Sequence, residues 1–219
     1  MKSQDIGLLL KLVSLEKQEG SFDPDQAPKA WPGNWQDWDP DEVSDKELQP
    51  EFDLQHPSQP FGAPSYTARS LEIETGISKS QINLSLNRCI DVGLATRERE
   101  TDIPRANRGA LYRFIVHGIK YVFPTRPGSM TRGIATAFAA PILREKLMSA
   151  GENVPVWPHA RGNTKGLAIE PLYRTATYAV KRDPQMYALL ALVDAIRIGQ
   201  PRESSLAASI LQKELDAFK

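Results

Sequence analysis

Apolar residues near the start of the chain recur at helical spacing, which predicts a helix over Ser3–Glu16 with Ser3 as its cap. One apolar side contains Ile6, Leu9, Leu10 and Val13, and a second side contains Leu8, Leu12 and Leu15. A helix that is apolar on two sides is buried between other elements or against a partner. Lys11 and Lys17 are left for solvent.

The end of the chain predicts a helical hairpin. Asp183 stands at a capping position, Pro184 in the first turn and Gly199 at the end of one helix, and a second helix follows Pro201. Both helices carry apolar stripes wider than a solvated surface would carry. We therefore expect the hairpin, together with the N-terminal helix, to form a dimer or bind a partner.

Residues 65–94 predict two short helices joined by a tight turn. The first helix runs from about Thr67 to Thr75, and Gly76 follows where the turn needs a positive φ. Ser78 is predicted to cap the second helix, with Gln81 as its capping-box partner. The buried stripe of the second helix contains Ile82, Ser85, Leu86, Cys89 and Ile90. Such a unit can place its second helix in the major groove of DNA.

This stretch resembles the winged helix-turn-helix of bacterial transcription regulators of the multiple-antibiotic-resistance (MarR) type. The resemblance rests on the Gly-Ile-Ser turn at residues 76–78 and on the ending that runs from Leu86 through Arg88 to Gly93 and Leu94. It covers about 30 residues strongly and does not cover the C-terminal half. A member of this family reads DNA with the second helix and carries a β-hairpin wing after it.

The resemblance implies a wing in the residues that follow. Leu94–Glu100 is predicted as its first strand, Thr101–Ala110 as its loop and Leu111–Val116 as its return strand. Residues 97–132 contain eight basic and three acidic side chains, which is the charge that contact with phosphates requires. Arg97 and Arg99 alternate with acidic residues, so they also fit a solvated strand face.

The predicted DNA-binding residues fall into two groups. Base contacts are expected from the polar start of the second helix, because amide side chains can pair with adenine and lysine can reach guanine. The candidate residues for base contacts are Lys79, Ser80, Gln81, Asn83 and Asn87. Phosphate contacts are expected from the wing, and its candidates are Arg97, Arg99, Arg105, Asn107 and Arg108. Leu84 is a departure, because an apolar side chain stands where relatives often carry a polar one. It fits a contact with a thymine methyl group or with a neighbouring element.

Composition adds an acidic insert to this picture. The chain has 219 residues and no net charge, but residues 21–64 carry ten acidic side chains against two lysines, together with eight prolines and three tryptophans. Proline at this density excludes a long helix. Residues 19–64 are therefore predicted as an insert that is either a linker or an irregular segment docked through Trp31, Trp35 and Trp38. Its charge suggests a gate that competes with DNA phosphates for the basic face.

The remaining chemistry is sparse. Cys89, the only cysteine, excludes a disulfide within the chain and fits a buried apolar position; a redox-sensing thiol is the alternative. No metal spacing, nucleotide fingerprint or catalytic motif appears. We expect no cofactor, no catalytic residues and no enzymatic activity. The apolar segments are too short for a membrane span, so a cytoplasmic protein without a membrane partner is expected.

The predicted fold is mainly α with a small β-hairpin wing (α+β), as a winged helix-turn-helix domain with a C-terminal α-rich domain. Its predicted parts are the N-terminal helix at 1–18, the insert at 19–64, the helix-turn-helix and wing at 65–123, and the C-terminal segment at 124–219. Two functions remain open. The first is a sequence-specific regulator of transcription, a dimeric repressor that binds double-stranded DNA. The second is an antitoxin-like or accessory module that uses the same fold to hold a protein partner.

Overall fold

The computed structural model describes residues 1–21, 35–39, 65–144, 146 and 154–216. Within these residues the protein is mainly helical, with one two-stranded antiparallel sheet and one sheet of three strands. The prediction of a mainly α fold with a small β-hairpin is confirmed at this level. None of the described helices combines the length and the apolar composition that a membrane span requires.

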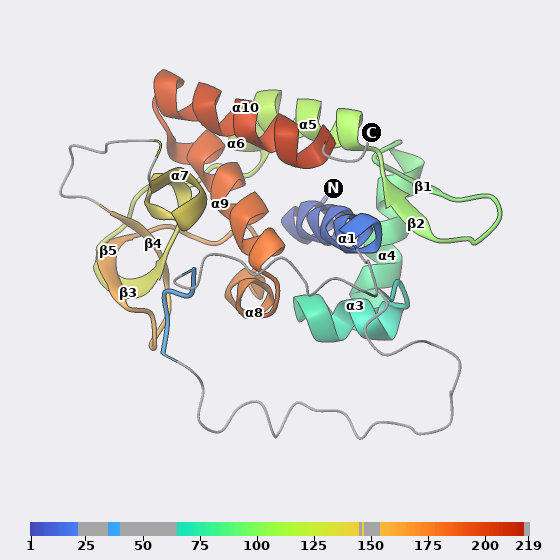
Figure 1. Cartoon of the computed structure of the whole chain (residues 1–219), viewed down its shortest axis with the longest axis horizontal. Coiled ribbons are helices and arrows are strands. Elements are labelled where there is room, and N and C mark those ends of the chain that lie inside the picture. The colour runs from blue at the N-terminus through green and yellow to red at the C-terminus, as the bar shows by residue number, and fades with distance from the viewer. Residues whose placement is uncertain (22–34, 40–64, 145, 147–153, 217–219) are drawn as a thin grey trace.

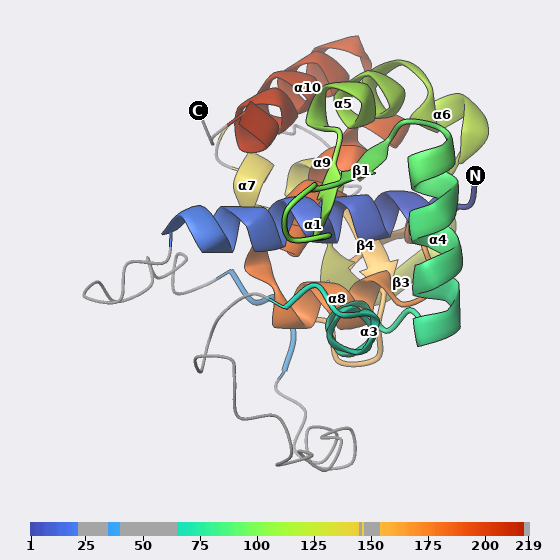
Figure 2. The same ribbon diagram turned by 90° about the vertical axis from the view of Figure 1, so that its right-hand side faces the viewer.

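Helix α1 (Ser3–Ser21) runs through the middle of the molecule (Figures 1 and 2). Every residue from position 5 to position 15 is buried, including Lys11, which the sequence pattern had left for solvent. The apolar surface that suggested a dimer element is therefore covered by other parts of the same chain. Burial on two sides follows from the two apolar stripes of this helix.

One side of α1 packs against α3 (Ala68–Thr75) and α4 (Lys79–Asp91). Gly76 between these two helices has φ 68°, the left-handed conformation that glycine adopts without steric cost. Ser78 stands at the N-cap of α4, but its side chain makes no capping hydrogen bond. The predicted capping box is wrong, because the side-chain oxygen of Gln81 instead accepts a hydrogen bond from Gln4 of α1.

The hairpin after α4 is shorter than predicted. Strand β1 (Ala95–Arg97) pairs antiparallel with β2 (Pro104–Ala106), so the turn between them spans residues 98–103. The predicted return strand at residues 111–116 is wrong, since these residues belong to helix α5 (Arg108–His117). Asn107 fixes this helix by accepting a hydrogen bond from the backbone N–H of Ala110. Leu111 and Ile115, four residues apart, form the buried side of α5.

The C-terminal segment contains strands as well as helices. A one-turn helix, α6 (Ile119–Val122), leads to β3 (Met130–Ala135), which pairs antiparallel with both β4 (Pro155–Pro158) and β5 (Thr164–Ala168). Strands β4 and β5 pair in parallel, so the three strands close into a small barrel. Gly133 and Gly162 allow this closure, because a Cβ atom at either position would overlap the neighbouring backbone.

Part of the acidic insert docks on this barrel. Trp38 forms an isolated bridge with Gly162, and its ring meets that of Trp35 edge-on at a centroid distance of 5.3 Å. Both rings lie near Tyr187, at 6.0 and 6.3 Å. Asp37 accepts hydrogen bonds from the backbone of Ala135 and from the hydroxyl of Thr164. The alternative of a docked segment is therefore correct for residues 35–39, while Trp31 lies outside the described residues.

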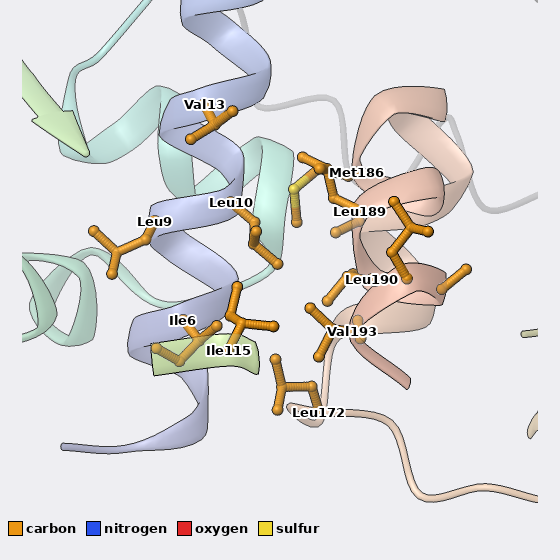
Figure 3. Close-up of a cluster of buried hydrophobic side chains, with 14 of the residues drawn as sticks. Ile6, Leu9, Leu10, Val13, Ile115, Leu172, Met186, Leu189, Leu190 and Val193 are labelled. Carbon is orange, nitrogen blue, oxygen red and sulfur yellow. The ribbon is translucent and has the colours of Figure 1, made fainter. Parts of the chain in front are cut away.

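Three helices follow the barrel: α8 (Ala176–Arg182), α9 (Pro184–Ile198) and α10 (Pro201–Asp216). The connection from β3 to β4 carries two short elements, η1 (Ala137–Ala139) and α7 (Pro141–Arg144). Helix α9 is buried from residue 185 to residue 197 and packs against α1, as Figure 3 shows for Leu10 and Leu189. Helix α8 packs on α3, and α10 packs on α5.

The described core joins these parts. Side chains from α1, α3, α4, α5, β4 and α8 to α10 belong to one hydrophobic cluster. The predicted helical hairpin is therefore present as α9 and α10, but α9 is covered within the chain. On α10 the exposed side chains are almost all polar: Arg202, Ser205, Ser209, Gln212, Lys213 and Asp216. The wide apolar stripes thus explain the packing of one copy of the chain and require no second copy.

Candidate nucleic-acid interface

The outer face of α4 is polar. Its inner face buries Ile82, Ser85, Leu86 and Cys89 against the core. Four of the five predicted base-contacting residues are exposed on this helix: Lys79, Ser80, Asn83 and Asn87. Leu84, on the same exposed side, keeps 49% of its surface accessible.

Gln81 differs from the other four. It is half-buried, and its side-chain oxygen accepts a hydrogen bond from the Gln4 amide at 3.1 Å. The same Gln4 nitrogen also donates to the hydroxyl of Ser85 at 3.3 Å. Gln81 therefore holds the start of α4 against α1, which is a structural role that helical spacing alone did not reveal.

A buried carboxylate fixes the other end of the contact between α1 and α4. Asp5 is fully buried and receives two hydrogen bonds from the guanidinium of Arg88, at 2.6 and 3.0 Å. The hydroxyl of Ser85 and the backbone N–H of Lys2 also donate to Asp5, both at 2.7 Å. Burial by itself raises the pKa of Asp5, but the hydrogen bonds outweigh it and hold this pKa below its usual value. Arg88, part of the family-like motif, is thus used to orient α4.

Cys89 lies on the buried side of the same helix. Its side chain has no accessible surface, and burial raises the pKa of the thiol to about 12. The thiol is therefore protonated at neutral pH, which does not favour the redox-sensing alternative, because the thiolate is the reactive species. The described residues also contain no group of three or more metal-ligating side chains placed to hold an ion.

The hairpin arginines divide into two pairs. Arg97 and Arg99 are exposed, and Arg97 forms an ion pair with Asp102 across the turn at 2.8 Å. Because both partners of that pair are largely exposed, it contributes little to stability and can exchange for another anion. Arg97 and Arg99 are thus available for phosphate contact.

Arg105 and Arg108 form ion pairs that hold the fold together. Arg105 lies on β2, outside the turn, and binds Glu19 of α1 at 2.7 Å and the hydroxyl of Tyr66 at 2.9 Å. Arg108 lies in the first turn of α5 and binds Glu16 of α1 at 2.5 Å. Both arginines therefore neutralise the C-terminal half of α1. The prediction placed them in an open loop because it took residues 101–110 for the wing loop.

The side chain of Asn107 also makes hydrogen bonds that stabilise the fold. Its side-chain oxygen caps α5, and its side-chain nitrogen donates to the backbone carbonyl of Gly93 at 3.0 Å. Of the ten predicted site residues, six have exposed side chains that hold no other element in place: Lys79, Ser80, Asn83 and Asn87 on α4, and Arg97 and Arg99 on the hairpin, where Arg97 pairs with Asp102 of the same turn. The other four hold the elements together.

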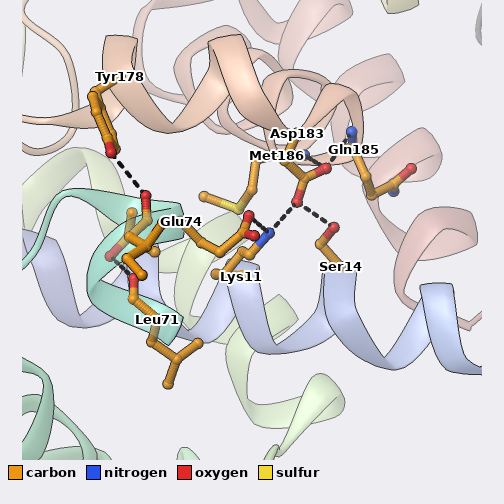
Figure 4. A network of polar contacts seen from close by, with 10 residues as sticks. Lys11, Ser14, Leu71, Glu74, Tyr178, Asp183, Gln185 and Met186 are labelled. Carbon is orange, nitrogen blue, oxygen red and sulfur yellow. Dashed lines mark hydrogen bonds and ion pairs between the residues drawn. The ribbon is translucent and has the colours of Figure 1, made fainter. Parts of the chain in front are cut away.

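A second polar network ties α1 to α3 and α9 (Figure 4). Lys11 is buried and binds Asp183 at 2.8 Å and Glu74 at 2.9 Å, and Ser14 also donates to Asp183. Burial lowers the pKa of Lys11, but the two carboxylates more than compensate and raise it above its usual value. Asp183 caps α9 through the backbone N–H groups of Gln185 and Met186. One carboxylate thus serves as helix cap and ion-pair partner together.

Comparisons with known proteins give no further guidance, since no family model, no curated protein and no solved structure matches this chain. The resemblance to MarR-type regulators seen in the sequence therefore stays a prediction. The functional assignment therefore depends on the geometry of α4 and of the surfaces around it.

Proposed function

We propose that this chain is a sequence-specific DNA-binding regulator of transcription with a winged helix-turn-helix, in which α3 and α4 are the two helices and the β1–β2 hairpin is the wing. Helix α4 would read the major groove and the hairpin would contact phosphates. The observation that carries the proposal is the division of α4 into a buried apolar face and an exposed polar face. A helix presented in this way offers several donors and acceptors to base edges.

The proposed base contacts come from Lys79, Asn83 and Asn87, with Ser80 beside them. Lys79, Asn83 and Asn87 follow each other along one side of α4 at spacings of four residues, so they can follow a groove. Asn can bind adenine through two hydrogen bonds, and Lys can donate to guanine acceptors. Arg97 and Arg99 supply the hairpin's phosphate contacts, while Arg105, Asn107 and Arg108 hold the hairpin and α5 in place.

We further propose that two copies bind one operator and repress transcription in the cytoplasm. One recognition helix reads too few base pairs for useful specificity, so a regulator of this kind normally binds two half-sites. Sedimentation of the protein with its operator should then give two chains per duplex. A single chain at saturation would contradict this part of the proposal.

The test of base reading uses the DNA upstream of the protein's own gene. We expect the wild-type protein to bind this duplex more tightly than a scrambled one of equal length. Asn83→Ala should reduce this preference by about 1–3 kcal/mol and leave binding to the scrambled duplex unchanged. Gln212→Ala, which removes an exposed amide from α10, is the matched control and should change neither affinity. Equal affinity of the wild type for both duplexes would contradict the proposal.

Exposed apolar residues favour a second candidate, an antitoxin-like or accessory module that holds a protein partner. Leu84 and Val92 expose 49% and 60% of their surfaces on and just after α4. If this face holds a protein, Leu84→Lys should abolish co-purification of the partner. If it holds DNA, the same change should leave non-specific DNA binding intact, because it adds a positive charge.

A further inference from the structure

Positive charge is also concentrated in a part of the chain that lies mostly outside the residues counted for the predicted wing. Residues 124–144 and 154–182 contain eight arginines and lysines but only one acidic residue, Glu170. In the hairpin, by contrast, Arg105 and Arg108 each have a glutamate of α1 as partner. These residues therefore carry a clear excess of positive charge, and one of their arginines, Arg174, lies beside the turn that leads into α4.

Arg174 is held next to the turn before α4 by the residues on either side of it. Tyr173 is buried against Gly7 of α1, where a Cβ atom would overlap its ring. Thr175 packs on Gly76, the glycine of the turn before α4, and a Cβ atom there would lie 2.9 Å from the Cβ atom of Thr175. Arg174 itself is exposed. Its backbone is thus positioned against both α1 and the turn that leads into α4.

Helix α8, which begins after Thr175, is anchored to the same region. The hydroxyl of Tyr178 donates to the backbone carbonyl of Ile73 at the end of α3, at 2.9 Å (Figure 4). The ring of Tyr178 also lies against the turn, because a Cβ atom at Gly76 would be 3.1 Å from its Cδ1 atom. At the far end of α8, Asp183 binds Lys11. The position of Arg174 relative to α4 is therefore set by contacts at both ends of α8.

The guanidinium of Arg174 has no ion pair or hydrogen bond within the part of the chain that the structure describes. The positive charge of its guanidinium is therefore available to a ligand. Close to a helix that enters the major groove, the nearest anions are the phosphates that border the groove. Arginine suits them, because its planar donors match phosphate oxygens.

We propose that Arg174 contacts a DNA phosphate beside the groove that α4 reads, so that the C-terminal segment forms part of the DNA-binding surface. This proposal rests on the proposed DNA-binding function and extends it to a segment outside the family-like region. It makes the residues just before α8 a phosphate-contacting element separate from the hairpin.

The test compares Arg174→Ala with Arg202→Ala. Arg202 is an exposed arginine at the start of α10, which lies across the molecule from α3 and α8 (Figures 1 and 2). Both variants lose one positive charge, so the net charge of the protein changes equally. Affinity is measured by fluorescence anisotropy at several salt concentrations, on the upstream duplex and on a mixed-sequence duplex of about three helical turns.

We expect Arg174→Ala to reduce the slope of log affinity against log salt by about 0.9 and to weaken binding roughly five- to tenfold on both duplexes at about 0.1 M salt. Arg174→Lys should restore most of the slope, and Arg202→Ala should leave it unchanged. Melting temperatures of all variants should match the wild type, since neither side chain supports the fold.

If the wild type binds DNA and Arg174→Ala has the same slope as Arg202→Ala, the role of Arg174 is wrong and the DNA-binding function stands. If the wild-type protein binds neither duplex, the DNA-binding function and the role of Arg174 are both wrong.

Discussion

Charged side chains have different roles around α1 and in the C-terminal segment. Around α1 they form ion pairs that connect elements of the fold: Asp5 binds Arg88, Lys11 binds Asp183, and Glu19 binds Arg105. In residues 124–144 and 154–182, positive charges outnumber negative ones and Arg174 is exposed without a partner among the described residues. The net charge of a stretch of sequence therefore does not predict the charge that this stretch presents on the surface. What decides is whether another part of the folded chain supplies the opposite charge, as α1 does for Arg105.

The largest expected effect comes from breaking the ion pair between α1 and α9. Lys11→Ala leaves the carboxylate of Asp183 buried without its cation, which should lower the free energy of unfolding by about 3–5 kcal/mol. Lys17→Ala is the control, because Lys17 and Glu214 are more than a quarter exposed, and it should cost at most about 1 kcal/mol. Urea denaturation measures both. If the two variants lost similar amounts of unfolding free energy, the buried ion pair would stabilise the fold no more than the exposed one.

A smaller effect is expected at Asp5, and it depends on pH. The folded pKa of Asp5 lies below its unfolded value of 3.8, so its contribution is complete above that value and is lost as pH falls through the folded pKa. Asp5→Asn should cost about 2–3 kcal/mol at pH 7, since Arg88 loses a charged partner. The penalty should shrink as the pH falls below about 4. A penalty that stays constant down to acid unfolding would contradict the assigned pKa direction.

Arg105→Ala tests whether the hairpin arginines nearest α1 are structural. Arg105 loses contacts with Glu19 and Tyr66, so the variant should be about 1–2 kcal/mol less stable by thermal denaturation. The salt dependence of its DNA binding should match the wild type. A reduced salt slope with unchanged stability would instead place Arg105 on the DNA.

Arg99→Ala should show the reverse behaviour with the smallest effect on stability. The exposed side chain makes no contact that the fold needs, so the free energy of unfolding should change by less than about 0.5 kcal/mol. The salt slope of DNA binding should fall by about 0.9. An unchanged slope would remove the hairpin from the DNA-binding surface.

The sequence predicted the elements with strong periodicity and missed those that depend on distant contacts. The helical spacing of α1, the left-handed Gly76 and the capping Asp183 were all readable from neighbouring residues. The barrel was not, because β3, β4 and β5 are short and close only through glycines that meet residues far along the chain. Local spacing also cannot show that a lysine has a buried partner 172 residues away, as Lys11 has.

The candidate site was predicted in part for the same reason. The helical spacing of the apolar residues in α4 predicts which of its positions are exposed, so Lys79 and Asn83 were predicted correctly as exposed. The hairpin was misjudged because residues 111–116 are rich in β-branched and aromatic side chains, while the cap at Asn107 starts a helix there. Arg174 was missed, because only the folded chain brings the start of α8 to the turn before α4.

The central claim, that the exposed face of α4 meets DNA, is tested most directly by site-specific crosslinking. A photoreactive amino acid would be placed at Asn87 on α4 or at Gln212 on α10, both of which are exposed. The upstream duplex is then added and the complex is irradiated. If α4 meets DNA, position 87 should crosslink to the duplex and position 212 should give no crosslink above background. Equal crosslinking from the two positions, or crosslinking from position 212 alone, would contradict it.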